Sequence, residues 1–92
     1  YLVRVAGSSL QGLGIHDADL VLVDKALTPR RGDVVVACVN GEPLLKILGG
    51  DKHQVILLSA NPQYPPRYIM ESEEFQIWGV YIGLCRVGRA SG

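Results

Sequence analysis

The sequence predicts a small, mainly β domain built from several curled antiparallel sheets. Short runs of β-branched and apolar residues recur along the chain, and each is bounded by glycine, proline, asparagine or aspartate. No segment has the apolar periodicity of an amphipathic helix, and no repeat or heptad pattern is present. A chain of 92 residues, 48% of them hydrophobic, can form one folded domain at most. We therefore treat residues 1–92 as a single domain.

The first two predicted strands are Tyr1–Ala6, which alternates and is rich in β-formers, and Leu20–Val23. Between them lies Gly7–Gly14, which contains three glycines and the adjacent serines Ser8 and Ser9. This composition predicts a turn that contains at most one helical turn.

The strongest local signal is Asn40-Gly41, which tolerates the positive φ angles of a type I′ turn. It predicts a hairpin that pairs the continuously apolar run Val34–Val39 with Glu42–Leu48. Pro43 cannot donate a backbone hydrogen bond, so it belongs at the start or edge of its strand.

The second half of the chain adds the strand Gln54–Ala60, the proline-stiffened loop Asn61–Pro66 and the long apolar segment Phe75–Val87. Gly79 and Gly83 predict bulges or bends within that last segment. We expect about seven short β segments altogether.

The charges and cysteines exclude several functional classes. Nine basic and nine acidic residues cancel, which argues against direct sequence-specific DNA binding by this domain. No apolar run approaches the ~20 residues of a membrane helix. Cys38 and Cys85 lie in apolar runs without nearby histidines, so we expect buried thiols in a reducing, cytoplasmic setting, with no metal and no cofactor.

The residues that carry chemistry are the serines of the glycine turn and Lys46, the one lysine of an otherwise apolar strand. A serine hydroxyl is a weak nucleophile that needs a base. A lysine becomes such a base when burial lowers its pKa, and Leu44 and Leu48 share its strand face. The glycine turn also exposes consecutive amides, so the backbone N–H groups of Ser8 and Ser9 are candidates for an oxyanion site.

Three alternatives compete with a serine and lysine pair. Lys46 could be an edge-strand lysine that blocks aggregation. A Ser-His-Asp triad could combine Ser8 or Ser9 with His16 and either Asp17 or Asp19, although His16 lies in a polar loop that orients it poorly. The domain could also be an idle dimerising and docking module.

Five segments of the chain resemble the catalytic domain of the LexA/UmuD autoproteases, whose fold is LexA/signal-peptidase-like. These segments are residues 6–10, 14–19, 23–24, 32–37 and 41–48. In that family the nucleophile is a serine in a Ser-Gly-x-Ser-Met pattern, and a strand lysine is the general base. Matching this pattern selects Ser9 over Ser8 and assigns the base to Lys46. The sequence departs from the pattern at Ala6 and Leu10, and Leu10 is a volume-conserving change from Met.

Two further segments, Asn61-Pro-Gln-Tyr-Pro and Ile77-Trp-Gly-Val, resemble the UmuD branch more than the LexA repressors. The resemblance implies cutting of one bond, usually Ala-Gly or Cys-Gly, in an N-terminal region when the protein is bound to a RecA nucleoprotein filament. In the UmuD branch the trimmed dimer then serves a Y-family DNA polymerase in translesion synthesis. Ala6-Gly7 is not that bond, because it lies beside the nucleophile. A repressor is the alternative.

The segment Phe75–Val87 also predicts assembly. Large apolar groups lie on both alternating faces of this segment, and so small a domain can cover only one of them. We expect a homodimer in which this segment is central, as the resemblance also implies. The alternative is a central strand that one subunit buries on both sides.

Overall fold

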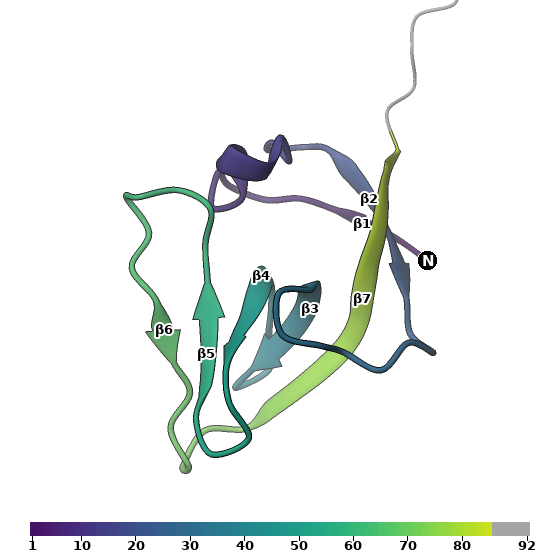
Figure 1. Cartoon of the computed structure of the whole chain (residues 1–92). Helices are drawn as coiled ribbons and strands as arrows, with labels where there is room; N and C mark the ends of the chain where they lie inside the picture. The colour runs from purple at the N-terminus through teal and green to yellow at the C-terminus, as the bar shows by residue number, and fades with distance from the viewer. Residues whose placement is uncertain (86–92) are drawn as a thin grey trace, which may run out of the picture.

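The computed structural model describes residues 1–85, and these form one antiparallel sheet of seven strands with the order β1-β2-β7-β3-β4-β5-β6 (Figure 1). The strands are β1 (Leu2–Arg4), β2 (Leu20–Asp24), β3 (Val34–Val39), β4 (Glu42–Gly50), β5 (Val55–Leu58), β6 (Arg67–Tyr68) and β7 (Phe75–Cys85). The one helical element in this part of the chain is a single 3₁₀ turn, Gln11–Leu13. The prediction of a mainly β domain is confirmed.

The expected separate sheets are joined into one because β7 pairs with two neighbours. Its first half pairs with β3 and its second half with β2, and Val80 has a partner in both strands. The register shifts beside Gly79 and beside Gly83, as the glycines predicted. Each shift leaves one β7 residue without a cross-strand partner, Trp78 in the first case and Ile82 in the second. These bulges bend β7 and curl the sheet, as Figure 1 shows.

The predicted hairpin is confirmed. Val39 lies opposite Glu42, and the two connecting residues have positive φ angles, 52° at Asn40 and 83° at Gly41. This is the conformation that a two-residue type I′ loop requires. β4 continues to Gly50, past the predicted end at Leu48.

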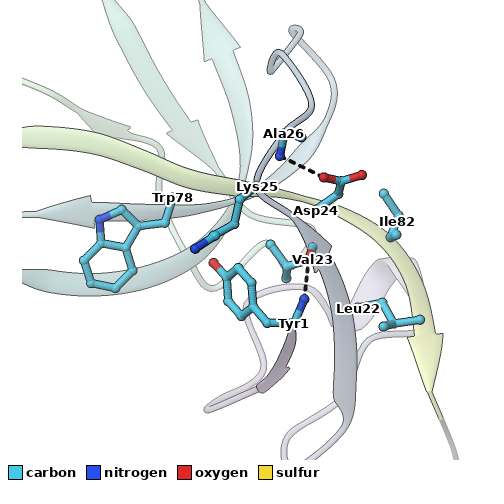
Figure 2. Close-up of a pocket in the computed structure, with 8 residues that line it drawn as sticks. All are labelled: Tyr1, Leu22, Val23, Asp24, Lys25, Ala26, Trp78 and Ile82. Carbon is cyan, nitrogen blue, oxygen red and sulfur yellow. Dashed lines mark hydrogen bonds between the residues drawn. The ribbon is translucent and has the colours of Figure 1, made fainter.

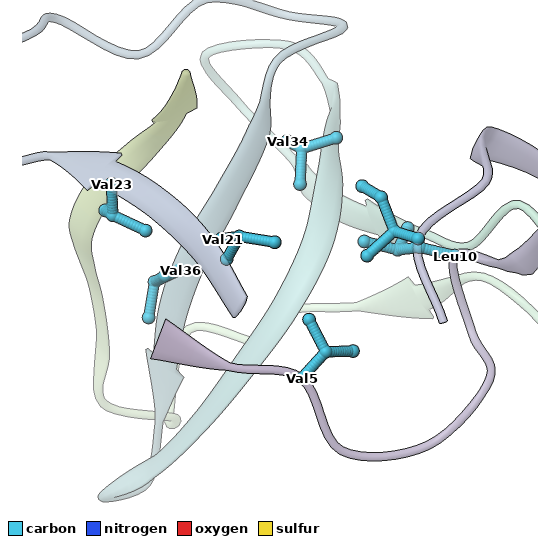
Figure 3. Packing of buried hydrophobic residues seen from close by; sticks show 7 residues of the cluster. Val5, Leu10, Val21, Val23, Val34 and Val36 are labelled. Atoms are coloured by element: carbon cyan, nitrogen blue, oxygen red, sulfur yellow. The ribbon is translucent and has the colours of Figure 1, made fainter. Parts of the chain in front are cut away.

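Two apolar clusters lie on opposite sides of β3, because successive side chains of a strand point to opposite faces. The first cluster contains Val34 and Val36, and Figure 3 shows these two residues with Leu10 and the other labelled valines of the cluster. Its buried members are Val5, Leu10, Ile15, Val21, Val23, Val34 and Val36. The second cluster contains Val35, Ala37 and Val39, with Leu44 and Leu48 of β4 packed against it.

Candidate active site

The turn between β1 and β2 is stabilised by hydrogen bonds to the residues that follow it. The backbone N–H of Gly7, whose φ is +88°, donates to the Asp17 carboxylate over 2.8 Å. Val5 and Ala18 complete this link, since Ala18 N–H donates to the Val5 carbonyl oxygen over 2.8 Å. Ser8 lies in a bend and Ser9 in a turn, so neither serine belongs to a strand. We call the segment Gly7–Gly14 the serine turn.

The serine turn is hydrogen-bonded to the chain that leaves β5. Ala60 N–H donates to the Ser9 carbonyl oxygen, and Gly12 N–H donates to the Ala60 carbonyl oxygen, both over 2.7 Å. The side-chain amide of Asn61 donates to the Ser8 carbonyl oxygen over 2.9 Å. Figure 1 shows the 3₁₀ turn beside the chain that leaves β5. These three bonds fix the serines relative to the β4–β5 part of the sheet.

Lys46 lies on β4 opposite Val35 and is half-buried. Its Nζ donates to the Ser59 hydroxyl oxygen over 2.8 Å. The same Nζ lies 4.9 Å from the centre of the Tyr64 ring, within the range of a cation–π contact. The register that pairs Ile47 with Leu58 places Ser59 opposite Lys46 when it is continued by one residue.

Burial lowers the pKa of Lys46 below that of an ordinary lysine, because the charged ammonium loses water among apolar neighbours. The charge of Tyr64 opposes this effect and is the smaller of the two influences on the pKa. The net result is a lysine whose neutral amine forms at lower pH than that of an exposed lysine.

Ser9 and Lys46 line one cavity of about 370 Å³, together with Tyr64. Arg4 and Glu42 place one positive and one negative side chain on its wall. The remaining lining residues are mostly apolar: Val3, Val5, Ala6, Val36, Pro43, Leu44 and Leu45. The cavity therefore combines Ser9, the Lys46 amine and an apolar wall.

Ser8 is not among the residues that line this cavity. It lines a separate hollow with Gln11 and Asn61, and its Oγ lies 3.4 Å from the Tyr64 hydroxyl. Neither the backbone N–H of Ser8 nor that of Ser9 takes part in a strand ladder. The amides proposed as oxyanion donors thus lie in the turn and outside the strand ladders.

Two residues of the site, Ser59 and Tyr64, were not predicted from the sequence. Lys46 donates its hydrogen bond to Ser59 rather than to Ser9, and Tyr64 covers the Lys46 amine. Ser59 was placed inside a predicted strand and Tyr64 inside a proline-rich loop. The available signal was a polar serine at the end of an apolar strand, but only the β4–β5 register shows that it faces Lys46.

The aspartates of the alternative triad accept hydrogen bonds from backbone N–H groups instead. Asp17 accepts from Gly7 N–H, and Asp19 accepts from the backbone N–H of His16 over 2.7 Å. His16 is exposed and is not among the residues that line the cavity of Ser9 and Lys46. The structure thus gives these carboxylates a role in shaping the serine turn.

A larger cavity, of about 870 Å³, lies on the other side of β2 and β7 and is lined by Tyr1, Leu22, Trp78 and Ile82 among others (Figure 2). Lys25 also lines this cavity, and its amine lies over the Tyr1 ring. The cavity has no serine, cysteine or histidine in its lining. Its lining combines apolar side chains with the charged residues Asp24 and Lys25.

Within residues 1–85, no three histidine, cysteine, aspartate or glutamate side chains gather as a metal site would require. In the same part of the chain, no helix has the length and apolar character needed to span a bilayer. Both cysteines are free thiols, Cys38 buried and Cys85 half-buried.

Comparison with known proteins decides the family. Residues 1–82 match the family described as Peptidase S24-like. The chain belongs to this family. Its relatives include LexA repressor 2 of Xanthomonas axonopodis pv. citri and the LexA repressor of Xylella fastidiosa, each 37% identical over 89 residues. Those residues cover 97% of this chain and 42% of the relative, so the chain spans about two fifths of the length of the repressors that it matches.

Membership of the Peptidase S24-like family makes this a peptidase-like domain. The relatives named here are repressors, so the predicted UmuD branch is not confirmed, and a LexA-like role is supported equally. The family and the mainly β fold predicted from the sequence are both confirmed.

Proposed function

We propose that Ser9 and Lys46 are the nucleophile and general base of a self-cleaving peptidase. The observation that carries the proposal is that one cavity contains both the Ser9 side chain and a lysine whose pKa burial has lowered. A neutral Lys46 amine accepts the Ser9 proton as Oγ attacks the scissile carbonyl carbon. The protonated lysine then gives that proton to the leaving amine, and water hydrolyses the acyl ester on Ser9.

In this mechanism the negative charge that develops on the carbonyl oxygen is stabilised by the backbone N–H groups of Ser8 and Ser9. Ser59 supports the base, because its hydroxyl accepts a hydrogen bond from Nζ and so limits the positions that the amine can take. The apolar wall contributed by Val36, Leu44 and Leu45 suits a substrate segment of small apolar residues.

The test compares single substitutions in a form of the protein that carries its cleavage segment. Ser9→Ala and Lys46→Ala should each abolish self-cleavage while the melting temperature stays close to that of the parent. Ser8→Ala is the matched control, because it keeps the backbone N–H and should still cleave. If Ser8→Ala were the inactive variant and Ser9→Ala the active one, the assignment of the nucleophile would be wrong.

The biological role that we propose is SOS-response self-cleavage in the cytoplasm, stimulated by a RecA nucleoprotein filament. In the UmuD-type version, the processed homodimer serves a Y-family DNA polymerase, and the segments around Asn61 and Ile77 support it. In the LexA-type version, cleavage inactivates a repressor, and the repressors among the relatives support it. A short arm preceding Tyr1 in the intact protein would favour the first version, and a helix-turn-helix domain the second.

A further inference from the structure

Tyr64 contacts the proposed base, Lys46, and the residue next to the proposed nucleophile. Its ring centre lies 4.9 Å from Lys46 Nζ, and its hydroxyl oxygen lies 3.4 Å from Ser8 Oγ, on the residue next to the nucleophile. It also lines the same cavity as Ser9. One side chain therefore spans the gap between the base and the serine turn.

The loop that carries Tyr64 is fixed at its base. Tyr64 N–H donates to the Asn61 carbonyl oxygen over 2.9 Å, and the Asn61 side-chain amide donates to the Ser8 carbonyl oxygen over the same distance. The Tyr64 side chain itself remains 37% exposed. The backbone thus places the ring at the cavity, and part of the residue remains exposed to solvent.

The phenol oxygen lies beside Ser8, one of the two residues whose amides are proposed to form the oxyanion site. Interaction with the Ser8 hydroxyl and, as a second cause, with the Ser8 backbone N–H lowers the pKa of Tyr64. That N–H is one of the two amides proposed to bind the carbonyl oxygen of the substrate. A single N–H group directed at the phenol is not available to the substrate at full strength.

The contacts that hold the ring in place are weak. An oxygen–oxygen distance of 3.4 Å is longer than the ordinary range for a hydroxyl hydrogen bond. A cation–π contact at a partly exposed site is also among the weaker interactions in proteins. Such contacts suit a group that is displaced during binding better than a rigid wall.

We propose that Tyr64 caps the cavity of Ser9 and Lys46 in the free domain, and that a substrate peptide displaces it before Ser9 attacks. This inference rests on the proposed dyad. In the capped state the ring covers the Lys46 amine, and the phenol oxygen lies against the Ser8 hydroxyl at the edge of the proposed oxyanion site. Displacement of one side chain then uncovers the base and the oxyanion site together.

The first test measures access to Lys46 in the domain itself and does not require proteolysis. The protein is treated with limiting acetyl N-hydroxysuccinimide ester, and acetylation of Lys46 is followed by mass spectrometry. Tyr64→Leu should raise the rate about two- to fivefold, as expected when a contact of cation–π strength is lost. Tyr68→Leu is the matched control, because Tyr68 is an exposed tyrosine of β6 outside the cavity. An unchanged rate in a folded Tyr64→Leu variant would overturn the cap.

The second test measures self-cleavage in the form that carries a cleavage segment. Tyr64→Phe keeps the ring and removes only the hydroxyl contact with Ser8, so cleavage should become about two- to fivefold faster. Adding Ser8→Ala should give no further gain, because both changes remove the same contact. Slower cleavage by Tyr64→Phe would overturn the cap and make the phenol part of the machinery. If the Ser9→Ala variant still cleaves itself, the proposed dyad is wrong. The acetylation rate of Lys46 then tests by itself whether Tyr64 caps the cavity.

Discussion

Lys46 is subject to two opposing influences, because burial lowers the pKa of its amine and the charge of Tyr64 raises it. Burial is the larger, so the pKa lies below that of an ordinary lysine. Only the neutral amine accepts a proton, so self-cleavage without RecA should speed up as the pH rises. The rise should begin at lower pH than the titration of a free lysine. The measurement is the cleavage rate from neutral to strongly alkaline pH, with Ser9→Ala as background. A rate that stays flat would contradict the buried-lysine mechanism.

Ser59 is the hydrogen-bond partner of Lys46, and its hydroxyl is partly buried. Ser59→Ala removes the acceptor that orients Nζ, and we expect cleavage to slow about tenfold, the effect of one hydrogen bond to a charged group at the lower end of its range. Ser59→Thr keeps a hydroxyl and should recover most of the rate. Both variants are compared with the parent by their self-cleavage rates at several pH values. An Ala variant that cleaves like the parent at every pH would show that Ser59 has no positioning role.

At the scale of elements, the serine turn depends on its close contact with the chain after β5. A Cβ added to Gly12 would lie 2.5 Å from the Ala60 carbonyl oxygen, a backbone atom that cannot move aside alone. Gly12→Ala should therefore separate the turn from Ala60, lower the melting temperature and slow cleavage at least about tenfold. Gly83→Ala is the matched control, because a Cβ there meets nothing within 4 Å. Thermal melts and cleavage assays compare the two. If the two variants melted and cleaved alike, the contact between Gly12 and Ala60 would not be what positions the serine turn.

The elements that the sequence predicted well are those specified by local signals. Asn40-Gly41 defines its hairpin because only a few residues tolerate both positive φ angles. The two-residue strand β6 was not predicted, because its pairing with β5 depends on contacts distant in sequence. The first strand ends at Arg4 rather than Ala6, since the backbone of Val5 pairs instead with Ala18 and Asp19 in the turn. The predicted end of the last strand, at Val87, lies outside the described residues.

The site was predictable to the same extent. Ser9 and Lys46 could be proposed from the sequence because a serine turn and a lone lysine on an apolar strand are visible within short windows. Ser59 and Tyr64 could not be, because their contacts with Lys46 follow from the β4–β5 register and from the path of the loop after β5. Such non-local geometry leaves no periodic pattern in a single sequence.

At the scale of the whole molecule, β7 is a central strand whose outer face remains uncovered. Its neighbours β2 and β3 occupy its two edges, while Trp78 is 42% and Ile82 is 55% exposed. Leu22 of β2 is 40% exposed beside them, and together they border the larger cavity of Figure 2. Tyr81, by contrast, packs against the first cluster. An apolar group of this kind on a small domain is typical of an interface.

The homodimer therefore remains our prediction, with the outer face of β2 and β7 as its contact. Ile82→Glu places a charge on that face without entering the core, so it should convert a dimer into a monomer. Leu13→Glu is the control, because Leu13 is an equally exposed apolar residue, at 52%, in the 3₁₀ turn. Sedimentation at low micromolar concentration measures all three proteins. A parent that sediments as a monomer would contradict the dimer. A dimer unaffected by Ile82→Glu would contradict this face, since a glutamate buried without a partner at the interface costs more than so small a contact can offset.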